Sequence, residues 1–294
     1  MPLTPIAGPA YFMPGRVNIG VIMGQNEAAF IDTGLDESGA RKAINAIEQA
    51  GARVVAILNT HAHADHCGGN AFVRRRTGAA IYAPAVEGSL IEHPEIEPWY
   101  LYGAAPFPAI DTKWFHAEPS PVDHILVDSV QLCGIALQIM PTPGHSIGQV
   151  AVLTPEVAFL GDALVAPEIL ERYPIQYVYD VMAHRETLKH LISLQQPWFI
   201  GAHFPPTCDL EGILAANNRN LERTAQAVWD AIESQGSIEE IVARTAEMLG
   251  VFSMDASAYF LNAAAIKAHL SAHAHAGRAG FEIQDRRPIW RRID

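Results

Sequence analysis

A continuous apolar run that leads directly into a histidine-rich segment is the feature that most constrains the fold of this chain. Residues 52–60 (ARVVAILNT) are predicted to form a strand buried on both faces, because their apolar residues do not alternate with polar ones. The amphipathic helix before this strand is predicted to begin at Asp36 or Ser38 and to end at Gly51. The histidine-rich segment 60–69 (THAHADHCGG) begins where the strand ends. Loops at the ends of strands in α/β layers often carry chemistry, so we expect an α/β fold with its functional site here.

Shorter β-rich runs and one further helix surround this unit. The predicted strands are residues 17–23, 28–34, 79–84, 130–140 and 149–161, and a helix is predicted over 70–78. Residues 85–127 differ, because six prolines interrupt a segment rich in tryptophan, tyrosine and phenylalanine. Such long segments are usually lids, binding loops or disordered, and the hydrophobicity of this one disfavours disorder. We therefore expect a lid or a binding loop.

From about residue 210 the pattern becomes helical. A long amphipathic helix is followed by a second, which Ser237 is predicted to cap, and by a third over 255–272. Residues 280–293 are typical of a hairpin with its turn at DRRP. Three helices and a terminal hairpin resemble a winged-helix module. We predict a catalytic domain over 1–209 and a helical, winged-helix-like module over 210–294.

The composition limits the functions open to the chain. Its 294 residues carry 20 basic and 32 acidic side chains, and the formal charge of −12 disfavours nucleic acid as a partner because a polyanion is repelled. The cysteines, Cys67, Cys133 and Cys208, are too few and too widely spaced for a disulfide framework or a cysteine-based zinc site. No secretory pattern is visible, and no apolar run approaches the roughly 18 residues of a membrane span. We expect a cytoplasmic protein with no membrane association, whose metal chemistry would use histidine and carboxylate.

The segment 60–69 contains the residue types that bind metal ions. Alternate residues of an extended or turning backbone point the same way, so His61 and His63 are predicted to reach one ion. Asp65 and His66, displaced by the turn, then face a neighbouring position. Imidazole and carboxylate without thiolate suit Zn²⁺, iron or Mn²⁺. The two glycines that end the segment allow tight backbone packing behind the ligands.

The same segment carries a family resemblance. HAHADH (61–66) is similar to the H-x-H-x-D-H signature of the metallo-β-lactamase superfamily, and further motifs similar to those of that family occur in the expected order. They are AAFIDTGLD (28–36) with Asp32, PTPGHSIGQ (141–149) with His145, FLGDALV (159–165) with Asp162, and IGAHFPP (200–206) with His203. The resemblance covers residues from about 15 to 210 and implies the αββα sandwich of that superfamily. One departure is GAHF around His203, where relatives often have Pro-Gly-His-Gly.

Carried over residue by residue, the resemblance implies two metal sites that share one aspartate. The first ion would lie on His61, His63 and His145, and the second on Asp65, His66 and His203, with Asp162 bridging and Asp32 supporting the site from outside. Seven nitrogen and oxygen donors are too many for one tetrahedral ion, and this number agrees with two bound ions. We predict two Zn²⁺, with iron or manganese as the alternatives.

The resemblance also implies hydrolysis, most like that of the glyoxalase II-like branch, whose members act on thioesters, lactones and related esters. Two ions would hold a bridging water and lower its pKa from 15.7 towards about 7, and the metal-bridged hydroxide would attack the acyl centre. Asp65 is the predicted catalytic residue, which would orient the nucleophile and pass a proton to the leaving group. The predicted partner is a small-molecule substrate, with Tyr177 and Tyr179 at the mouth of its pocket. A homodimer is also a possibility that the sequence leaves open.

Other functions remain open at this point. A mononuclear-iron persulfide dioxygenase-like enzyme would use only His61, His145 and Asp162, and the intact second set disfavours it. A metal-dependent endoribonuclease or phosphodiesterase would need a basic groove, which the net charge of −10 over residues 1–209 disfavours. A winged-helix regulator with a vestigial metal domain conflicts with seven retained candidate ligands.

The remaining candidate residues are predicted to have structural roles. The eight histidines outside the motifs are expected at the surface, and they are His93, His116, His124, His184, His190, His269, His273 and His275. Cys67 is expected to be a small buried packing residue. The three arginines at 74–76 are expected to form a solvated helix face.

Overall fold

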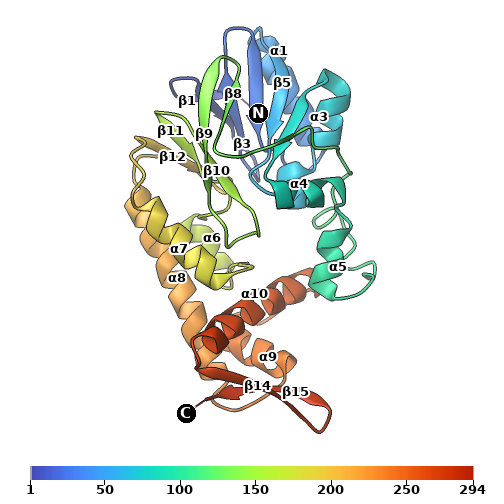
Figure 1. Ribbon diagram of the computed structural model, residues 1–294, viewed down its shortest axis with the longest axis vertical. Coiled ribbons are helices and arrows are strands. Elements are labelled where there is room, and N and C mark those ends of the chain that lie inside the picture. Colours follow the sequence, from blue (N-terminus) through green and yellow to red (C-terminus); the bar gives the residue numbers. More distant parts are fainter. Residues whose placement is uncertain (1, 294) are drawn as a thin grey trace.

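Two stacked β-sheets with helices on both outer faces make up most of the molecule, and a helical module lies at one end (Figure 1). The computed structural model describes residues 2–293. The first sheet contains, in spatial order, β1 (Thr4–Ala7), β2 (Ala10–Met13), β3 (Ile19–Met23), β4 (Glu27–Ile31), β5 (Arg53–Leu58), β6 (Ala80–Ala83) and β7 (His124–Ile125). Its strands are antiparallel as far as β4 and parallel from there on.

The second sheet faces the first. It contains, in spatial order, β13 (Phe204–Thr207), β12 (Trp198–Gly201), β11 (Val157–Phe159), β10 (Val150–Leu153), β9 (Ile135–Pro141) and β8 (Ser129–Leu132). Apolar side chains from both sheets, such as Leu58 of β5 and Val152 of β10, form one buried cluster between them. Burial of this apolar surface is the main stabilising contribution that holds the two sheets together.

Helices cover the outer face of each sheet, which confirms the αββα sandwich. On the first sheet, α1 (Glu37–Gln49) and α3 (Asn70–Thr77) bury residues such as Ile44 and Val73 against Phe30 and Ile57. On the second sheet lie α7 (Val181–Leu191) and the first part of α8 (Leu210–Ala231), and α6 (Pro167–Arg172) packs against α8. The predicted caps are confirmed for α1, which begins after Asp36, whose carboxylate accepts from the backbone N–H groups of Ser38 and Gly39.

Two of the predicted strands are wrong, because each is a hairpin. Residues 130–140 contain β8 and β9, which turn at Cys133 and Gly134, both with positive φ. Residues 149–161 contain β10 and β11, whose turn is closed by Thr154. In both cases the apolar, β-prone pattern continues across a turn only two or three residues long, so the periodicity alone does not show the break.

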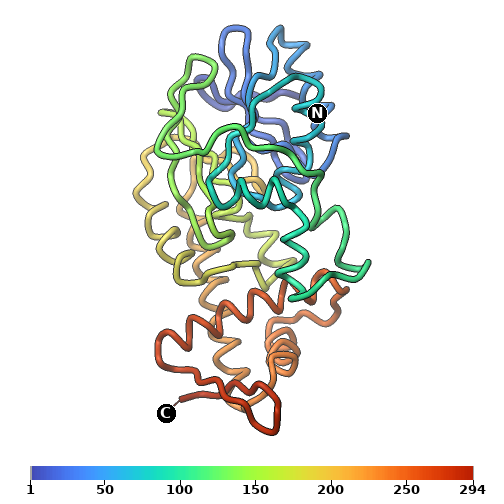
Figure 2. Tube along the Cα trace, turned by 45° about the vertical axis from the view of Figure 1, so that its right-hand side comes forward, coloured from blue at the N-terminus to red at the C-terminus, as the bar shows by residue number. Residues whose placement is uncertain are grey.

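The proline-broken segment 85–127 is more regular than a plain loop. It contains the short helices α4 (Ala85–Glu92) and α5 (Ile96–Tyr102). The first of these packs against the single-turn α2 (Ala64–Cys67), which carries part of the histidine motif. The end of α5 contacts the C-terminal module through ring pairs of Tyr102 and Phe107 with Phe260. Figures 1 and 2 both show this segment next to the start of α10 (Ala256–His275).

The C-terminal region contains the predicted three helices and hairpin. After α8 come α9 (Ile238–Met248), α10 (Ala256–His275) and the hairpin of β14 (Ala279–Gln284) and β15 (Arg287–Arg292). Ser237 caps α9 in a capping box with Glu240, as predicted. The second half of α8 packs with α9 and α10 in an apolar cluster of its own. No helix within residues 2–293 is long and apolar enough to cross a bilayer.

Candidate metal centre

The structure brings all seven predicted ligands together from four separate connections. His61, His63, Asp65 and His66 lie between β5 and the end of α2, His145 follows β9, Asp162 follows β11, and His203 lies between β12 and β13. Three overlapping groups of these side chains have donor atoms within 4.8 Å of one another: His61–His63–His145, His61–His66–Asp162 and Asp65–His66–His203. Residues far apart in the sequence therefore converge on one site.

The first group is a tight cluster of three imidazoles. Nδ1 of His63 lies 3.0 Å from Nε2 of His61 and 2.9 Å from Nε2 of His145. Three ring nitrogens that face one point at this spacing have the arrangement of ligands around a single cation.

Asp162 lies between this cluster and the second group. Its Oδ2 is 3.6 Å from Nε2 of His145 and 3.3 Å from Nε2 of His203, and its Oδ1 is 3.4 Å from Nε2 of His66. Asp65 is farther out, with carboxylate oxygens 4.0 Å from Nε2 of His66 and 3.9 Å from Nε2 of His203. One carboxylate therefore contacts imidazoles of both groups.

Two atoms at the centre of this arrangement have unmet bonding capacity. Nε2 of His66 and Oδ1 of Asp162 are both buried, and neither has a hydrogen-bond partner within the described chain. Buried polar atoms without partners are costly, and most are satisfied by protein, water or an ion. Their position between the two groups fits a bound metal ion at this point.

The outward-facing nitrogens of the imidazoles are held by other groups. Nδ1 of His66 lies 2.8 Å from a carboxylate oxygen of Asp32, Nδ1 of His145 lies 3.1 Å from the carbonyl oxygen of Tyr177, and Nδ1 of His203 lies 3.1 Å from that of Arg16. Such contacts orient metal-binding histidines and select the tautomer whose other nitrogen faces the ion.

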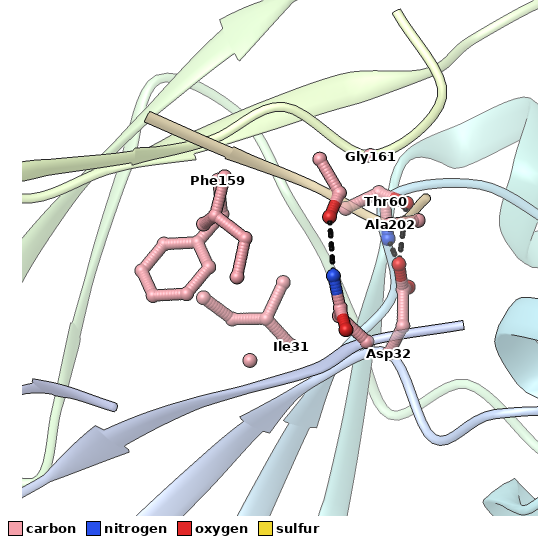
Figure 3. Close-up of a pocket in the computed structure, with 10 residues that line it drawn as sticks. Ile31, Asp32, Thr60, Phe159, Gly161 and Ala202 are labelled. Carbon is pink, nitrogen blue, oxygen red and sulfur yellow. Dashed lines mark hydrogen bonds between the residues drawn. The ribbon is translucent and has the colours of Figure 1, made fainter. Parts of the chain in front are cut away.

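Asp32 lies beside the site, where it bonds to Thr60 at the start of the histidine segment (Figure 3). Its carboxylate accepts hydrogen bonds of 2.8 Å from both the backbone N–H and the hydroxyl of Thr60. Asp32 is buried and has a φ of 59°, a backbone conformation that is uncommon for residues other than glycine. The carboxylate thus connects β4 to the start of the histidine segment and to His66.

Close backbone packing behind the ligands confirms the role predicted for the two glycines after Cys67. A Cβ atom on Gly68 would lie 2.0 Å from the carbonyl oxygen of Leu35, and one on Gly69 would lie 2.7 Å from that of Thr33. Side chains at either position would displace the segment that carries Asp65 and His66.

Sequence reasoning missed Glu87, a buried carboxylate that links two ligand loops. Its oxygens accept hydrogen bonds from the backbone N–H of Ala62 (2.8 Å) and of Gly148 (2.6 Å), and from the hydroxyl of Ser146 (2.9 Å). Burial raises its pKa, while these donors oppose the rise. No local motif marks Glu87, because its donors lie 25 to 61 residues away in sequence.

A second buried carboxyl, Glu97 on α5, was also missed. Burial raises its pKa well above the usual range, and the nearby carboxylates of Asp65 and Glu87 add to this effect. The only sequence signal was its place in the aromatic segment 85–127.

Burial and charge divide the imidazoles into two kinds. Burial, with the neighbouring imidazoles, lowers the pKa of His63 to about 4 and that of His145 to about 3, and it lowers the pKa of His61 as well. For His66 burial acts in the same direction, but the carboxylates of Asp162, Asp32 and Asp65 outweigh it and raise the pKa. At neutral pH the first group is therefore uncharged, which is the form of histidine that binds metals.

Negative charge is concentrated on the second side of the site. Asp162 raises the pKa of His203. Burial acts to raise the pKa of Asp162 itself, but His203 and His66 outweigh it and hold that pKa well below the usual range. Asp162 is therefore ionised, so a carboxylate faces the imidazole nitrogens of both groups.

The two tyrosines predicted to line the pocket mouth differ in position. The ring of Tyr177 lies with its centroid 5.6 Å from that of His63 and 5.7 Å from that of His145. Tyr179 is 51% exposed, and its backbone N–H donates to the carbonyl oxygen of Gly144. Of the two, Tyr177 lies directly against the imidazoles.

The surface prediction for the other histidines is wrong in three cases. His184, His269 and His273 are buried, at 0%, 1% and 8% exposure. The prediction failed because a histidine on a helix gives no sign of which neighbouring helix covers it. His93, His124, His190 and His275 are exposed and His116 is partly exposed.

The structural roles predicted for Cys67 and the arginine run are confirmed. Cys67 is 2% exposed and its thiol contacts the carbonyl oxygen of Ala62. Arg74, Arg75 and Arg76 on α3 each form an ion pair with a carboxylate outside that helix, namely those of Asp123, Glu118 and Glu48.

Comparison with solved structures places the whole chain in a known architecture. A metallo-beta-lactamase family protein from Thermus thermophilus is similar with a TM-score of 0.73 and 20% identity, covering 97% of this chain and 99% of that one. A beta-lactamase domain protein from Burkholderia ambifaria is similar with a TM-score of 0.76 and 17% identity, covering 100% and 96%. These similarities include the C-terminal helices and, at such identities, concern the fold.

Sequence comparison gives the family. Hydroxyacylglutathione hydrolases from Hyphomonas neptunium and Synechococcus sp. are 33% and 30% identical, over 37% and 48% of this chain. The matches span only 34% and 47% of those relatives' own length. The family profile described as "Metallo-beta-lactamase superfamily" matches residues 13–203, about two thirds of the chain and every one of the seven converging side chains. The chain therefore belongs to the metallo-beta-lactamase superfamily.

Proposed function

We propose that this protein is a dinuclear metal-dependent hydrolase, with zinc as the metal, that cleaves a thioester, a lactone or a related ester of a small molecule. The observation that carries the proposal is the pair of buried, unpartnered atoms at the centre of the site. Nε2 of His66 and Oδ1 of Asp162 lie 3.4 Å apart, and the other oxygen of Asp162 faces His145 of the first group.

The donor set fits two ions. His61, His63 and His145 would hold the first ion, Asp65, His66 and His203 would hold the second, and Asp162 would contact both. Nitrogen and carboxylate oxygen donors in groups of three with a shared carboxylate suit Zn²⁺ with open positions for substrate. When bound, the two ions would supply an acidified water as nucleophile and polarise the oxygen of the acyl group.

The protein's own residues have separate tasks in this proposal. The Asp65 carboxylate is 29% exposed, so it can reach both the nucleophile and the leaving group. It would orient the nucleophile, accept its proton and return that proton to the leaving group. Asp32 and Glu87 would keep the ligand loops in place, because each accepts hydrogen bonds from backbone and side-chain groups of those loops.

The substrate class is supported by the relatives and by the site wall. The names of the curated relatives describe removal of an acyl group from glutathione, which is hydrolysis of a thioester. The ring of Tyr177 beside His63 and His145 offers a flat apolar surface for the acyl part. Tyr179, more exposed, would contact the substrate farther out.

A mononuclear-iron persulfide dioxygenase is less well supported. Such an enzyme would need only His61, His145 and Asp162, whereas Asp65, His66 and His203 also have donor atoms within 4.8 Å of one another. Keeping three further donors at this spacing favours a second ion over a single one.

The decisive experiment combines metal analysis with a substrate panel. Metal content and anomalous scattering at the zinc and iron edges would be measured on the purified protein, which would be assayed with thioesters, lactones and phosphodiesters. Two zinc ions per chain and thioester or lactone hydrolysis that a chelator abolishes are the expected results. One iron per chain with oxygen consumption on a persulfide would overturn the proposal.

A further inference from the structure

A second polar cavity lies where the C-terminal module meets the sandwich, away from the metal centre. It has a volume of about 120 Å³ and lies between α7, α8 and α10. At about 30 Å³ per water molecule, this is room for several waters or one tetrahedral oxyanion. Its polar lining consists of Arg185, Glu222, Gln226, His269, His273 and Arg278.

The two histidines of this cavity are buried and incompletely bonded. His269 is 1% exposed and its Nδ1 has no hydrogen-bond partner within residues 2–293. His273 is 8% exposed, and its Nε2 lies 3.0 Å from the carbonyl oxygen of Ala225, to which it donates. One ring nitrogen of His269, a residue that lines the cavity, is therefore an unused hydrogen-bonding atom.

The positive charge of the two guanidinium groups that line the cavity exceeds the negative charge of its acidic lining. Arg185 donates from Nε to Glu222 at 2.9 Å, which leaves its terminal N–H groups free. Arg278 lies over the ring of Trp229, 4.2 Å from its centroid, and the described chain offers it no carboxylate within 4.0 Å. With neutral histidines the cavity therefore has a net charge of about one positive unit.

The electrostatics of His269 agree with a positive cavity. Burial lowers its pKa to about 3, and Arg185, His273 and His184 add to this effect. A bound anion would oppose the lowering of the His269 pKa by the surrounding positive charge.

A metal ion is the less suitable occupant. No group of three histidine, cysteine or carboxylate donors comes together here within the described residues, in contrast to the metal centre. Two guanidinium groups would also repel a cation, whereas their forked N–H groups match the geometry of a phosphate or similar oxyanion.

We propose that this junction cavity binds a small tetrahedral oxyanion of the phosphate kind, held by Arg185, Arg278 and His269. The anion would connect α7, which covers the second sheet, to α10 of the C-terminal module. This site is separate from the proposed hydrolytic centre, and its occupation does not depend on that function.

Titration with inorganic phosphate tests the proposal on the full, metal-loaded chain. Phosphate replaces chloride at constant ionic strength, and the indole N–H signal of Trp229 is followed by nuclear magnetic resonance, assigned with Trp229→Phe. Trp229 is a local reporter because Arg278 stacks on it and the His273 ring is 5.4 Å away. A saturable shift of this signal is expected.

Three variants distinguish the cavity from other phosphate sites. Arg278→Gln is expected to weaken binding by about tenfold or more, and Arg278→Lys by less, because a lysine keeps the charge but not the fork. Arg287→Gln removes an exposed arginine of the same module and is expected to leave the affinity within about twofold. Arg185→Lys provides a second test if Arg278→Gln does not fold.

Two results would overturn the proposal. One is the absence of a saturable shift at Trp229, including the case in which phosphate shifts only signals near the metal centre. The other is equal phosphate affinity in Arg278→Gln and Arg287→Gln, or in Arg185→Lys and wild type if Arg278→Gln does not fold.

Discussion

Two groups of buried histidines in this molecule differ in what surrounds them. At the metal centre, the ring nitrogens of His61, His63 and His145 face one another beside an ionised carboxylate. At the junction of α7 with α10, His184 has no hydrogen-bond partner on either ring nitrogen within the described chain, and no carboxylate group assembles with it.

The comparison shows that burial of a histidine does not by itself indicate a metal site. The nitrogens that face away from the metal centre are held by Asp32, by Tyr177 or by Arg16, so that the inward-facing ones are oriented. His184 instead packs with its backbone against Gly144, where a Cβ atom would lie 2.4 Å from the His184 Cα. A metal site is distinguished by ring nitrogens that converge on one point, and by hydrogen-bond partners that orient the opposite nitrogens of such rings.

The largest effect is expected for Asp162→Asn. This change removes the charge that both donor groups share, so hydrolysis of the best substrate in the panel should fall by about a thousandfold, since each ion contributes several kcal/mol of transition-state stabilisation. The rate would be measured with saturating zinc. Asp128→Asn, an exposed aspartate, is the matched control and should keep the wild-type rate. A similar rate in both variants would contradict the assignment.

The next largest effect is on stability without metal. His66→Leu leaves the buried Asp32 carboxylate without its imidazole partner, so the free energy of unfolding in EDTA should fall by about 3 kcal/mol. His184→Leu replaces an imidazole without hydrogen bonds by an apolar group of similar size and should change it by about 1.5 kcal/mol or less. Urea unfolding measures both. Equal losses in the two variants would show that His66 and His184 contribute alike to stability, which would contradict the difference between the two groups.

Glu87→Gln is expected to weaken metal binding while the ligands themselves remain. The amide offers donors where Ala62, Ser146 and Gly148 also donate, so the zinc affinity should fall about 10- to 100-fold. Competition with a chromophoric chelator gives the affinity. Glu118→Gln, an exposed carboxylate on the same segment, should bind zinc as wild type does.

The last effect concerns the pH dependence that His184 contributes to stability. Burial holds its pKa at about 3 in the folded protein, below the ordinary value of 6.5. As the pH falls from 6.5 towards 3, the unfolded chain takes up a proton that the folded protein does not, so stability is lost at about 1.4 kcal/mol per pH unit. His184→Leu should lack this loss, and urea unfolding in EDTA across this window measures the difference. Parallel pH profiles for the variant and wild type would contradict it.

Much of the fold was predictable because local patterns and the final packing agree. The buried strand before His61, the capped helix after Asp36 and the glycines that follow Cys67 all fold as their sequence indicates. The hairpins at Cys133 and Thr154 were missed because the apolar pattern continues through each turn. Local periodicity does not record where a strand reverses when both arms are equally buried.

The types and the order of the candidate ligands can be read from the sequence alone, because a short motif contains four of them and the others follow in recognisable loops. Two other properties follow only from how the chain packs: Glu87 links two of those loops, and three further histidines are buried, namely His184, His269 and His273. The reason is that their environments come from chain segments tens of residues away. A hydrogen bond or a covering helix at that distance leaves no local pattern in the residues that it affects.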